Sequence, residues 1–299
     1  MIEVSHLSKR FGDRLALDDV SFSVGAGRVT AFLGPNGSGK TTTMRILLGL
    51  DFASAGVALV NGVPFATLRD PMSQLGALLD ARGAHPGRSA FNHLRALALT
   101  HHVPNGRVDD VLDQVGLQDV AGNRVGGFSL GMRQRLGIAG ALLGDPSTLI
   151  FDEPINGLDP DGVHWFRQLV RDLANQGKTV FLSSHLISEV ALTADHVIVL
   201  GRGRVLADAP LAEFGGAARV HVRTRRASEL ARLLDSAGIV NTVSDDTVSA
   251  ESTSTGTVGE LAASAGIALS ELFEDRESLE GVYRALTGSD VEYRPSVNK

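Results

Sequence analysis

The residues most able to do chemistry form a glycine-rich stretch, GPNGSGKT, at residues 34–41. Its glycines allow a tight turn, so that successive backbone N–H groups can converge on the phosphates of a nucleotide. Lys40 adds a positive charge for the β- and γ-phosphates, and the Thr41 hydroxyl can bind Mg²⁺. An apolar run precedes the stretch and an apolar-faced segment follows it, which is the strand–loop–helix context that such a loop needs. The predicted nucleotide-binding residues are Gly34, Pro35, Asn36, Gly37, Ser38, Gly39, Lys40, Thr41 and Thr42.

A phosphate loop needs an acidic group for its metal, and the stretch TLIFDEP supplies two carboxylates. Four residues of a buried-strand type precede Asp152 and Glu153. Asp152 can hold Mg²⁺ through water, and Glu153, one residue further, can polarise an attacking water. Alone, the pair would be two solvated acids in a turn. After a phosphate loop, we predict Asp152 as a metal residue and Glu153 as a catalytic one.

A second stretch, GGFSLGMRQRLGIAGALL at residues 126–143, has the composition of a helix that begins at a serine cap. The free N–H groups and the dipole of such a helix end suit an anion. In isolation the stretch would be an ordinary capped helix, with Arg133 and Arg135 on its solvated face. Since the chain already has one phosphate loop, a second anion-binding helix end needs a reason.

In order and spacing, these stretches resemble the motifs of the ATP-binding subunits of ABC transporters, over residues 1–210. The glycine-rich loop is similar to Walker A, FSLGM at 128–132 to the LSGGQ signature, and LIFDEP to Walker B with its glutamate. NGLDP resembles the D-loop, and FLSSH the switch segment. The resemblance implies that Phe11 stacks on adenine, that Asp159 shapes the dimer contact, and that His185 orients water near Glu153.

The resemblance also gives the second helix end a role. In this family two subunits associate head to tail, so Ser129 and Gly131 would contact ATP that the other subunit's loop holds. The implied cofactors are ATP and Mg²⁺. The implied partners are a sister ATPase, identical or different, and a transmembrane permease subunit docked near residues 80–100.

The chain departs from the family pattern at two places. In the signature, Phe128, Leu130 and Met132 replace the usual Leu, Gly and Gln, whereas Ser129 and Gly131 remain. At the Q-loop, Asp80 stands where the family has Gln or Glu, and it is predicted as a further metal residue. Gln74 is an alternative Q-loop residue in another register. The signature departure removes the contacts of the usual glutamine side chain, and the Q-loop departure bears on how ATP binding is coupled to the membrane partner.

The elements that must position these residues alternate between short apolar strands and helices, which predicts an α/β fold with a largely parallel sheet. The resemblance makes this a P-loop ABC ATPase fold: a RecA-like core with an antiparallel β subdomain and a helical subdomain. We expect the ATPase domain at residues 1–210 and its helical subdomain at about 85–143. A small α+β accessory domain is predicted at 217–287, with 243–258 polar and rich in turns, and a disordered tail at 288–299.

Composition narrows the class of protein. The 299 residues contain no cysteine and carry a net charge of −6, which suits a reducing compartment and argues against a nucleic-acid-coating protein. The N-terminus lacks the apolar core of a signal peptide, and no stretch is apolar enough to span a membrane. We therefore expect a peripheral subunit on the cytoplasmic side of the cell membrane.

Two classes of function fit the sequence. The first is an energy-coupling ATPase for export of a drug, antibiotic or peptide, because the signature stretch and the short accessory domain resemble ABC-2-type exporters. The alternative is a non-transport ABC ATPase that acts on the ribosome or in DNA repair. A single cassette without room for long coiled coils disfavours that alternative.

Overall fold

The computed structural model describes residues 1–299 except 102, 105, 215–218, 276–278 and 288–299, so the predicted tail at 288–299 lies outside the described residues. The chain forms two compact units, residues 1–211 and residues 212–286. Each unit has its own hydrophobic core and is described separately below.

A six-stranded sheet is the centre of the first unit. Its strand order is β5 (Leu75–Leu78), β6 (Thr148–Phe151), β7 (Thr179–Ser184), β3 (Arg28–Leu33), β8 (His196–Gly201) and β9 (Arg204–Pro210). All neighbouring pairs are parallel except β8 and β9. Every residue of β6, β7 and β8 is buried, as expected for parallel strands covered on both faces. The α/β prediction is confirmed.

A three-stranded antiparallel sheet lies beside it, in the order β2 (Arg14–Val24), β1 (Ile2–Phe11) and β4 (Ala55–Val60). Three phenylalanines join the two sheets: Phe22 from β2, Phe32 from β3 and Phe181 from β7. Their ring centroids are 5.2 to 5.7 Å apart, within the range of favourable aromatic pairs. This shared core fixes the end of β1 relative to the loop that follows β3.

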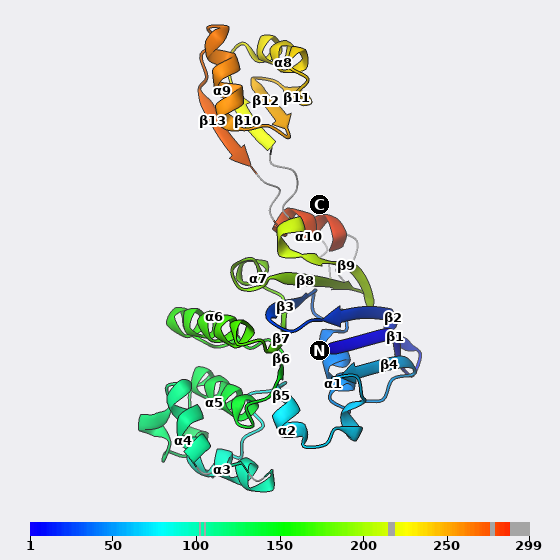
Figure 1. Cartoon of the computed structure of the whole chain (residues 1–299), viewed down its shortest axis with the longest axis vertical. Helices are drawn as coiled ribbons and strands as arrows, with labels where there is room; N and C mark the ends of the chain where they lie inside the picture. Colours follow the sequence, from blue (N-terminus) through cyan, green and yellow to red (C-terminus); the bar gives the residue numbers. More distant parts are fainter. Residues whose placement is uncertain (102, 105, 215–218, 276–278, 288–299) are drawn as a thin grey trace, which may run out of the picture. The chain divides into compact units, whose positions relative to one another are not determined.

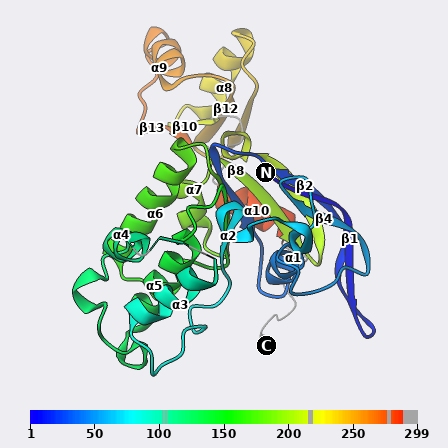
Figure 2. The same ribbon diagram turned by 60° about the horizontal axis from the view of Figure 1, so that its bottom comes forward.

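Helices complete the first unit (Figures 1 and 2). Helix α1 (Lys40–Leu47) follows β3, and the short α2 (Pro71–Gln74) precedes β5. Helices α3 (Ala90–Thr100), α4 (Gly106–Gln114) and α5 (Leu130–Leu142) gather between β5 and β6 in the chain. Helix α6 (Pro160–Asn175) buries one face, and α7 (Ile187–Thr193) connects β7 to β8. One-turn 3-10 helices lie at Phe65–Thr67, Gln118–Val120, Val125–Gly127 and Leu211–Phe214.

The second unit contains a four-stranded antiparallel sheet in the order β11 (Asn241–Ser244), β12 (Thr247–Glu251), β10 (Arg219–Arg223), β13 (Glu271–Asp275). Helix α8 (Ala227–Ser236) follows β10, and α9 (Thr255–Ser264) follows β12. This chain order is the split β-α-β arrangement of ferredoxin-like domains. A last helix, α10, covers Leu279–Thr287.

The hairpin of β11 and β12 differs from the sequence-based expectation, which took residues 243–258 as polar turns. Although the segment is polar, Val248 and Ala250 alternate with polar residues and are fully buried in the core of the second unit. Asp245, in the left-handed region at φ 51°, forms part of the turn. Two buried apolar residues were enough to define a strand there.

Candidate nucleotide-binding and hydrolysis site

The glycine-rich loop connects the carboxyl end of β3 to the start of α1, the usual position of a binding site in an open parallel sheet. Gly39 is at φ +112°, and a Cβ there would lie 2.6 Å from the Leu17 side chain. No residue with a side chain could take this position without displacing its neighbours. The close approach of β2 therefore requires glycine immediately before α1.

Lys40 is buried under this loop, with a relative exposure of 6%. Its Nζ donates to the carbonyl oxygens of Gly34, at 2.7 Å, and Pro35, at 3.3 Å. It also lies 3.8 Å from Oε1 of Glu153. Burial lowers the pKa of Lys40, and the Glu153 carboxylate opposes that effect. The ammonium is thus held at the loop by partners that phosphate oxygens can replace.

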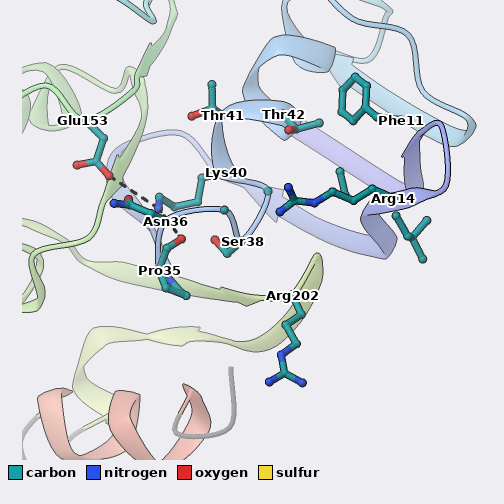
Figure 3. A pocket seen from close by; sticks show the side chains of 14 residues that line it. Phe11, Arg14, Pro35, Asn36, Ser38, Lys40, Thr41, Thr42, Glu153 and Arg202 are labelled. Carbon is teal, nitrogen blue, oxygen red and sulfur yellow. Dashed lines mark hydrogen bonds and ion pairs between the residues drawn. The ribbon is translucent and has the colours of Figure 1, made fainter. Parts of the chain in front are cut away.

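A pocket of about 960 Å³ opens over the loop (Figure 3). Figure 3 shows Phe11 and Arg14 on one side of the loop and Glu153 on the other. Phe11, at the end of β1, is 48% exposed, and Nζ of Lys9 lies 4.7 Å from its ring centroid. A half-exposed ring can offer its face to a base. The lining residues are Phe11, Arg14, Leu15, Ala16, Pro35, Asn36, Gly37, Ser38, Gly39, Lys40, Thr41, Thr42, Glu153 and Arg202.

Asp152 follows β6 directly and faces the start of α1. The Thr41 hydroxyl donates to its Oδ2 at 2.7 Å, and the Ser183 hydroxyl donates to its Oδ1 at 2.5 Å. A hydroxyl and a carboxylate side by side are hard oxygen donors of the kind that Mg²⁺ prefers together with substrate phosphates. Thr41 and Asp152 therefore fit a magnesium ion.

Glu153 has an unusual backbone, with φ at 49° in the left-handed region. Its N–H donates to Ser183 Oγ at 2.9 Å, and its carbonyl accepts a bond from Gln134 Nε2 at 3.3 Å. Its Oε2 lies 2.8 Å from Nδ1 of His185, the residue that follows β7. The two side chains meet because β6 and β7 are parallel neighbours whose carboxyl ends lie together. Strained residues of this kind cluster at functional sites.

The predicted signature residues lie elsewhere in the unit. Ser129 is the N-cap of α5, and its Oγ accepts the N–H of Met132 at 3.2 Å. Asp159 is the N-cap of α6 and accepts the N–H of Gly162 at 2.8 Å. Ser129, Gly131 and Asp159 do not line the pocket over the glycine-rich loop. The chain therefore presents a nucleotide pocket and a separate anion-suited helix end.

The two Q-loop alternatives also lie outside the pocket lining. Asp80 is two residues past β5, and its Oδ1 accepts the Arg82 N–H at 2.8 Å. This backbone bond lowers the pKa of Asp80. Gln74 ends α2, and its Nε2 donates to the Arg69 carbonyl at 2.5 Å. Each side chain is bonded to a close neighbour in the chain, and the metal role of Asp80 remains a prediction.

Sequence reasoning missed four polar residues of the site. Arg14 and Arg202 line the pocket from the start of β2 and from the turn between β8 and β9. Ser183 bridges Asp152 and the Glu153 backbone, and Gln134 holds the Glu153 carbonyl. The stretch FLSSH places two serines between an apolar strand and His185, and this pattern could have pointed to Ser183. Arg14 lies only three residues from the predicted Phe11, whereas Arg202 comes from a turn distant in the chain that no motif marked.

Within the described part of the chain, no helix is long and apolar enough to cross a membrane. The described residues also contain no group of three or more His, Cys, Asp or Glu that could hold a metal by themselves.

Comparison with known proteins identifies relatives over most of the chain. Residues 17–156 match the ABC transporter family, and residues 218–280 match a domain of unknown function, DUF8746. The bacitracin transport ATP-binding protein BcrA of Bacillus licheniformis is 39% identical over 214 residues, 70% of each chain. BcrA of Enterococcus faecalis is 31% identical over 303 residues, 96% of each chain. The lantibiotic transport ATP-binding protein SrtF of Streptococcus pyogenes is 34% identical over 206 residues, 69% of this chain and 89% of SrtF.

Solved structures agree with this assignment. An ATP-binding subunit of an ABC transporter is 27% identical, with a TM-score of 0.66 over 72% of this chain and 91% of the other. CbiO1 of Clostridium perfringens, part of the ABC transporter complex cbiONQ, is 29% identical, with a TM-score of 0.62 over 71% of this chain and 89% of CbiO1. Because relatives of this identity cover the cassette, and one covers nearly the whole length, the chain belongs to the ATP-binding subunits of ABC transporters, which are ATPases.

Proposed function

We propose that two subunits of this type bind ATP between them and power the export of a peptide antibiotic through a separate permease. The observation that carries the proposal is that the nucleotide pocket and the signature helix end lie apart within one chain. The pocket is lined by the glycine-rich loop on one side, and Ser129 is exposed at the start of α5. A second subunit, head to tail with the first, would bring its Ser129 and Gly131 to the γ-phosphate.

In this arrangement the free N–H groups at the start of α5 would donate to the γ-phosphate, where the helix dipole favours negative charge. Asp159, which begins α6, would lie at the same contact. Loss of the γ-phosphate would remove these hydrogen bonds and loosen the pair. The partner can be a second copy or a sister ATPase.

Within each pocket, this chain's residues would have separate tasks. Phe11 would stack on adenine, and residues 34–42 would surround the phosphates. Lys40 would exchange its carbonyl partners for phosphate oxygens. Thr41 and Asp152 would hold Mg²⁺, which neutralises phosphate charge when it is bound. Glu153 would accept a proton from the attacking water, while His185 keeps the carboxylate and the water in position.

The names of the relatives support the part of the proposal that concerns transport across the membrane. BcrA and SrtF are named for bacitracin and lantibiotic transport, and CbiO1 is part of a larger transporter complex. A chain whose described helices cannot cross a membrane needs such a partner for transport. We infer a peripheral position on the cytoplasmic face, with the permease docked near residues 80–100. We take the ATPase domain as residues 1–210, its helical subdomain as about 85–143 and the accessory domain as 217–287.

A membrane co-purification tests the proposal. The tagged chain is expressed in its own host, and detergent-solubilised membranes are captured with Mg²⁺ and ATP. We expect one integral membrane protein at a fixed ratio, and co-expression of the two should protect a sensitive strain against bacitracin or a lantibiotic. The matched control is Glu153→Gln, which should still capture the permease but give no protection. Recovery with ribosomes or DNA, and no integral membrane protein, would instead favour the non-transport alternative.

A further inference from the structure

Trp165 is the only tryptophan in the chain, and it lies on α6 beside a buried phenylalanine. Phe166 is 1% exposed and packs edge-on against Phe151 of β6, with ring centroids 5.5 Å apart. Trp165 is only partly buried and faces helix α5 instead. Phe166 thus attaches α6 to the central sheet, and Trp165 attaches α6 to α5, the helix that begins with the signature residues.

The contact with α5 is made through Arg135. The guanidinium carbon of Arg135 lies 4.5 Å from the Trp165 ring centroid, which is cation–π distance. Arg135 Nη1 donates to the Val115 carbonyl at 2.9 Å, and Trp165 Nε1 donates to the Gln114 carbonyl at 3.3 Å. Both side chains are therefore held by consecutive carbonyls at the end of α4. Three helices meet at this point.

A second contact joins the N-terminus of α5 to the loop before α6. Gly157 is at φ +82°, and a Cβ there would lie 2.4 Å from Cδ2 of Leu130. A Cβ on Gly131 would lie 2.9 Å from the Gly157 carbonyl. The first turn of α5 therefore lies directly on the loop that leads to Asp159. Residues 130 and 135 are about 7.5 Å apart along a helix axis, at 1.5 Å per residue.

We propose that Trp165 is a positioning residue, which with Arg135 holds the signature helix in register with the loop and helix that carry Asp159. The first-turn contact fixes the start of α5 against the loop, and Gln134 bonds α5 to the Glu153 carbonyl. The Arg135–Trp165 contact, more than a turn beyond the first-turn contact, adds a direct connection between α5 and α6. Ser129 and Asp159 then reach the partner's nucleotide as one unit. This inference rests on the proposed dimer.

The test compares variants that differ at this one contact. Trp165→Leu removes the π face, Trp165→Phe retains part of it, and Arg135→Lys retains the charge but not the planar guanidinium. Trp165→Leu should lower kcat by about tenfold, which is 1.4 kcal/mol of barrier, and leave the Kd for ATP within about twofold. Trp165→Phe should recover most of the loss. His164→Leu, an exposed neighbour on the same helix, should behave as the wild type.

The single tryptophan gives a readout that is independent of turnover. Removing the guanidinium by Arg135→Leu should raise the acrylamide quenching of Trp165 fluorescence, because the ring loses the group that covers it. Normal kcat in Trp165→Leu, or unchanged quenching in Arg135→Leu, would overturn the proposed clamp. Failure of the proposed function is seen separately, as the absence of any ATP-dependent dimer in Glu153→Gln. An absent dimer would overturn both the proposed function and this inference, whereas with the dimer present kcat and quenching decide whether Trp165 positions α5.

Discussion

His185 Nδ1 lies 2.8 Å from Oε2 of Glu153, although the two residues belong to different strand–turn segments. The other carboxylate oxygen, Oε1, lies 3.8 Å from Nζ of Lys40. Glu153 therefore connects His185 to Lys40 of the glycine-rich loop. In the proposed mechanism, phosphate oxygens at Lys40 would leave one carboxylate oxygen for water, while His185 would hold the other.

This geometry predicts the effect of Glu153→Gln. The amide cannot accept a proton as the carboxylate does, so turnover should fall by about 10²–10⁴, the usual scale for a general base. ATP binding should persist, because the glycine-rich loop and Thr41 are untouched. Steady-state ATPase assays and size-exclusion chromatography with ATP measure both effects. Asp110→Asn, an exposed carboxylate on α4, is the control. Near-normal turnover in Glu153→Gln would remove Glu153 from the role of base.

Arg14 should contribute to nucleotide affinity through a phosphate. Figure 3 shows its side chain directed toward the glycine-rich loop, whereas the Arg202 guanidinium is directed away. A charge-assisted hydrogen bond is worth about 1.5–3 kcal/mol, and exposure reduces that value, so Arg14→Ala should weaken ATP binding about tenfold. Competition against a fluorescent ATP analogue should show the same loss for ADP and AMP but none for adenosine. Arg202→Ala is the matched control, and an equal loss for adenosine would rule out a phosphate contact.

Asp80 and Ser183 should differ sharply in their importance for hydrolysis. Asp80 is held by Arg82 outside the pocket lining, so Asp80→Ala should change turnover of the isolated subunit by less than about twofold, within the usual range of surface substitutions. Ser183 donates to Asp152 and accepts the Glu153 N–H. Its removal should cost about 10–100-fold, as is typical when a partner of a metal ligand is lost. Mg²⁺ titrations of ATPase activity compare the two. A large loss in Asp80→Ala would return Asp80 to the metal site.

His93 should make the stability of the fold depend on pH. Burial lowers the pKa of His93 on α3, Arg88 adds to the effect, and Nδ1 is buried without a hydrogen-bond partner. Since the unfolded chain binds a proton more readily, stability rises with pH through the interval between the lowered pKa and about 6.5. This stabilisation is complete above about pH 6.5 and is lost as the pH falls through the folded-state pKa.

Replacing His93 should therefore flatten part of the acid limb of the stability curve. Urea unfolding of His93→Gln between pH 5 and 7 should show a smaller loss of unfolding free energy than the wild type. His101→Gln, at the exposed end of the same helix, should leave the curve unchanged. An identical pH dependence in His93→Gln and wild type would exclude His93 as the source.

The sequence by itself determined the nature of the chemistry. The spacing of GPNGSGKT fixes a phosphate loop because only closely spaced glycines and one lysine can form it. The alternation of apolar strands with helices predicted the α/β fold class, and the order of the motifs predicted the ABC family; both are confirmed. The polar hairpin of the second unit was missed, since burial of only Val248 and Ala250 defines its inner strand.

Only the tertiary structure decided which residues stand together. The parallel pairing of β6 and β7 brings Ser183 to Asp152 and Glu153, and packing of β2 on β3 brings Arg14 to the loop. The structure also bonds Asp80 to Arg82 and places Trp165 over Arg135. A motif consists of residue types close together in the sequence, where the geometry of the chain limits the local conformations. Contacts between distant segments depend on how the sheets and helices pack, and no local pattern in the sequence encodes them.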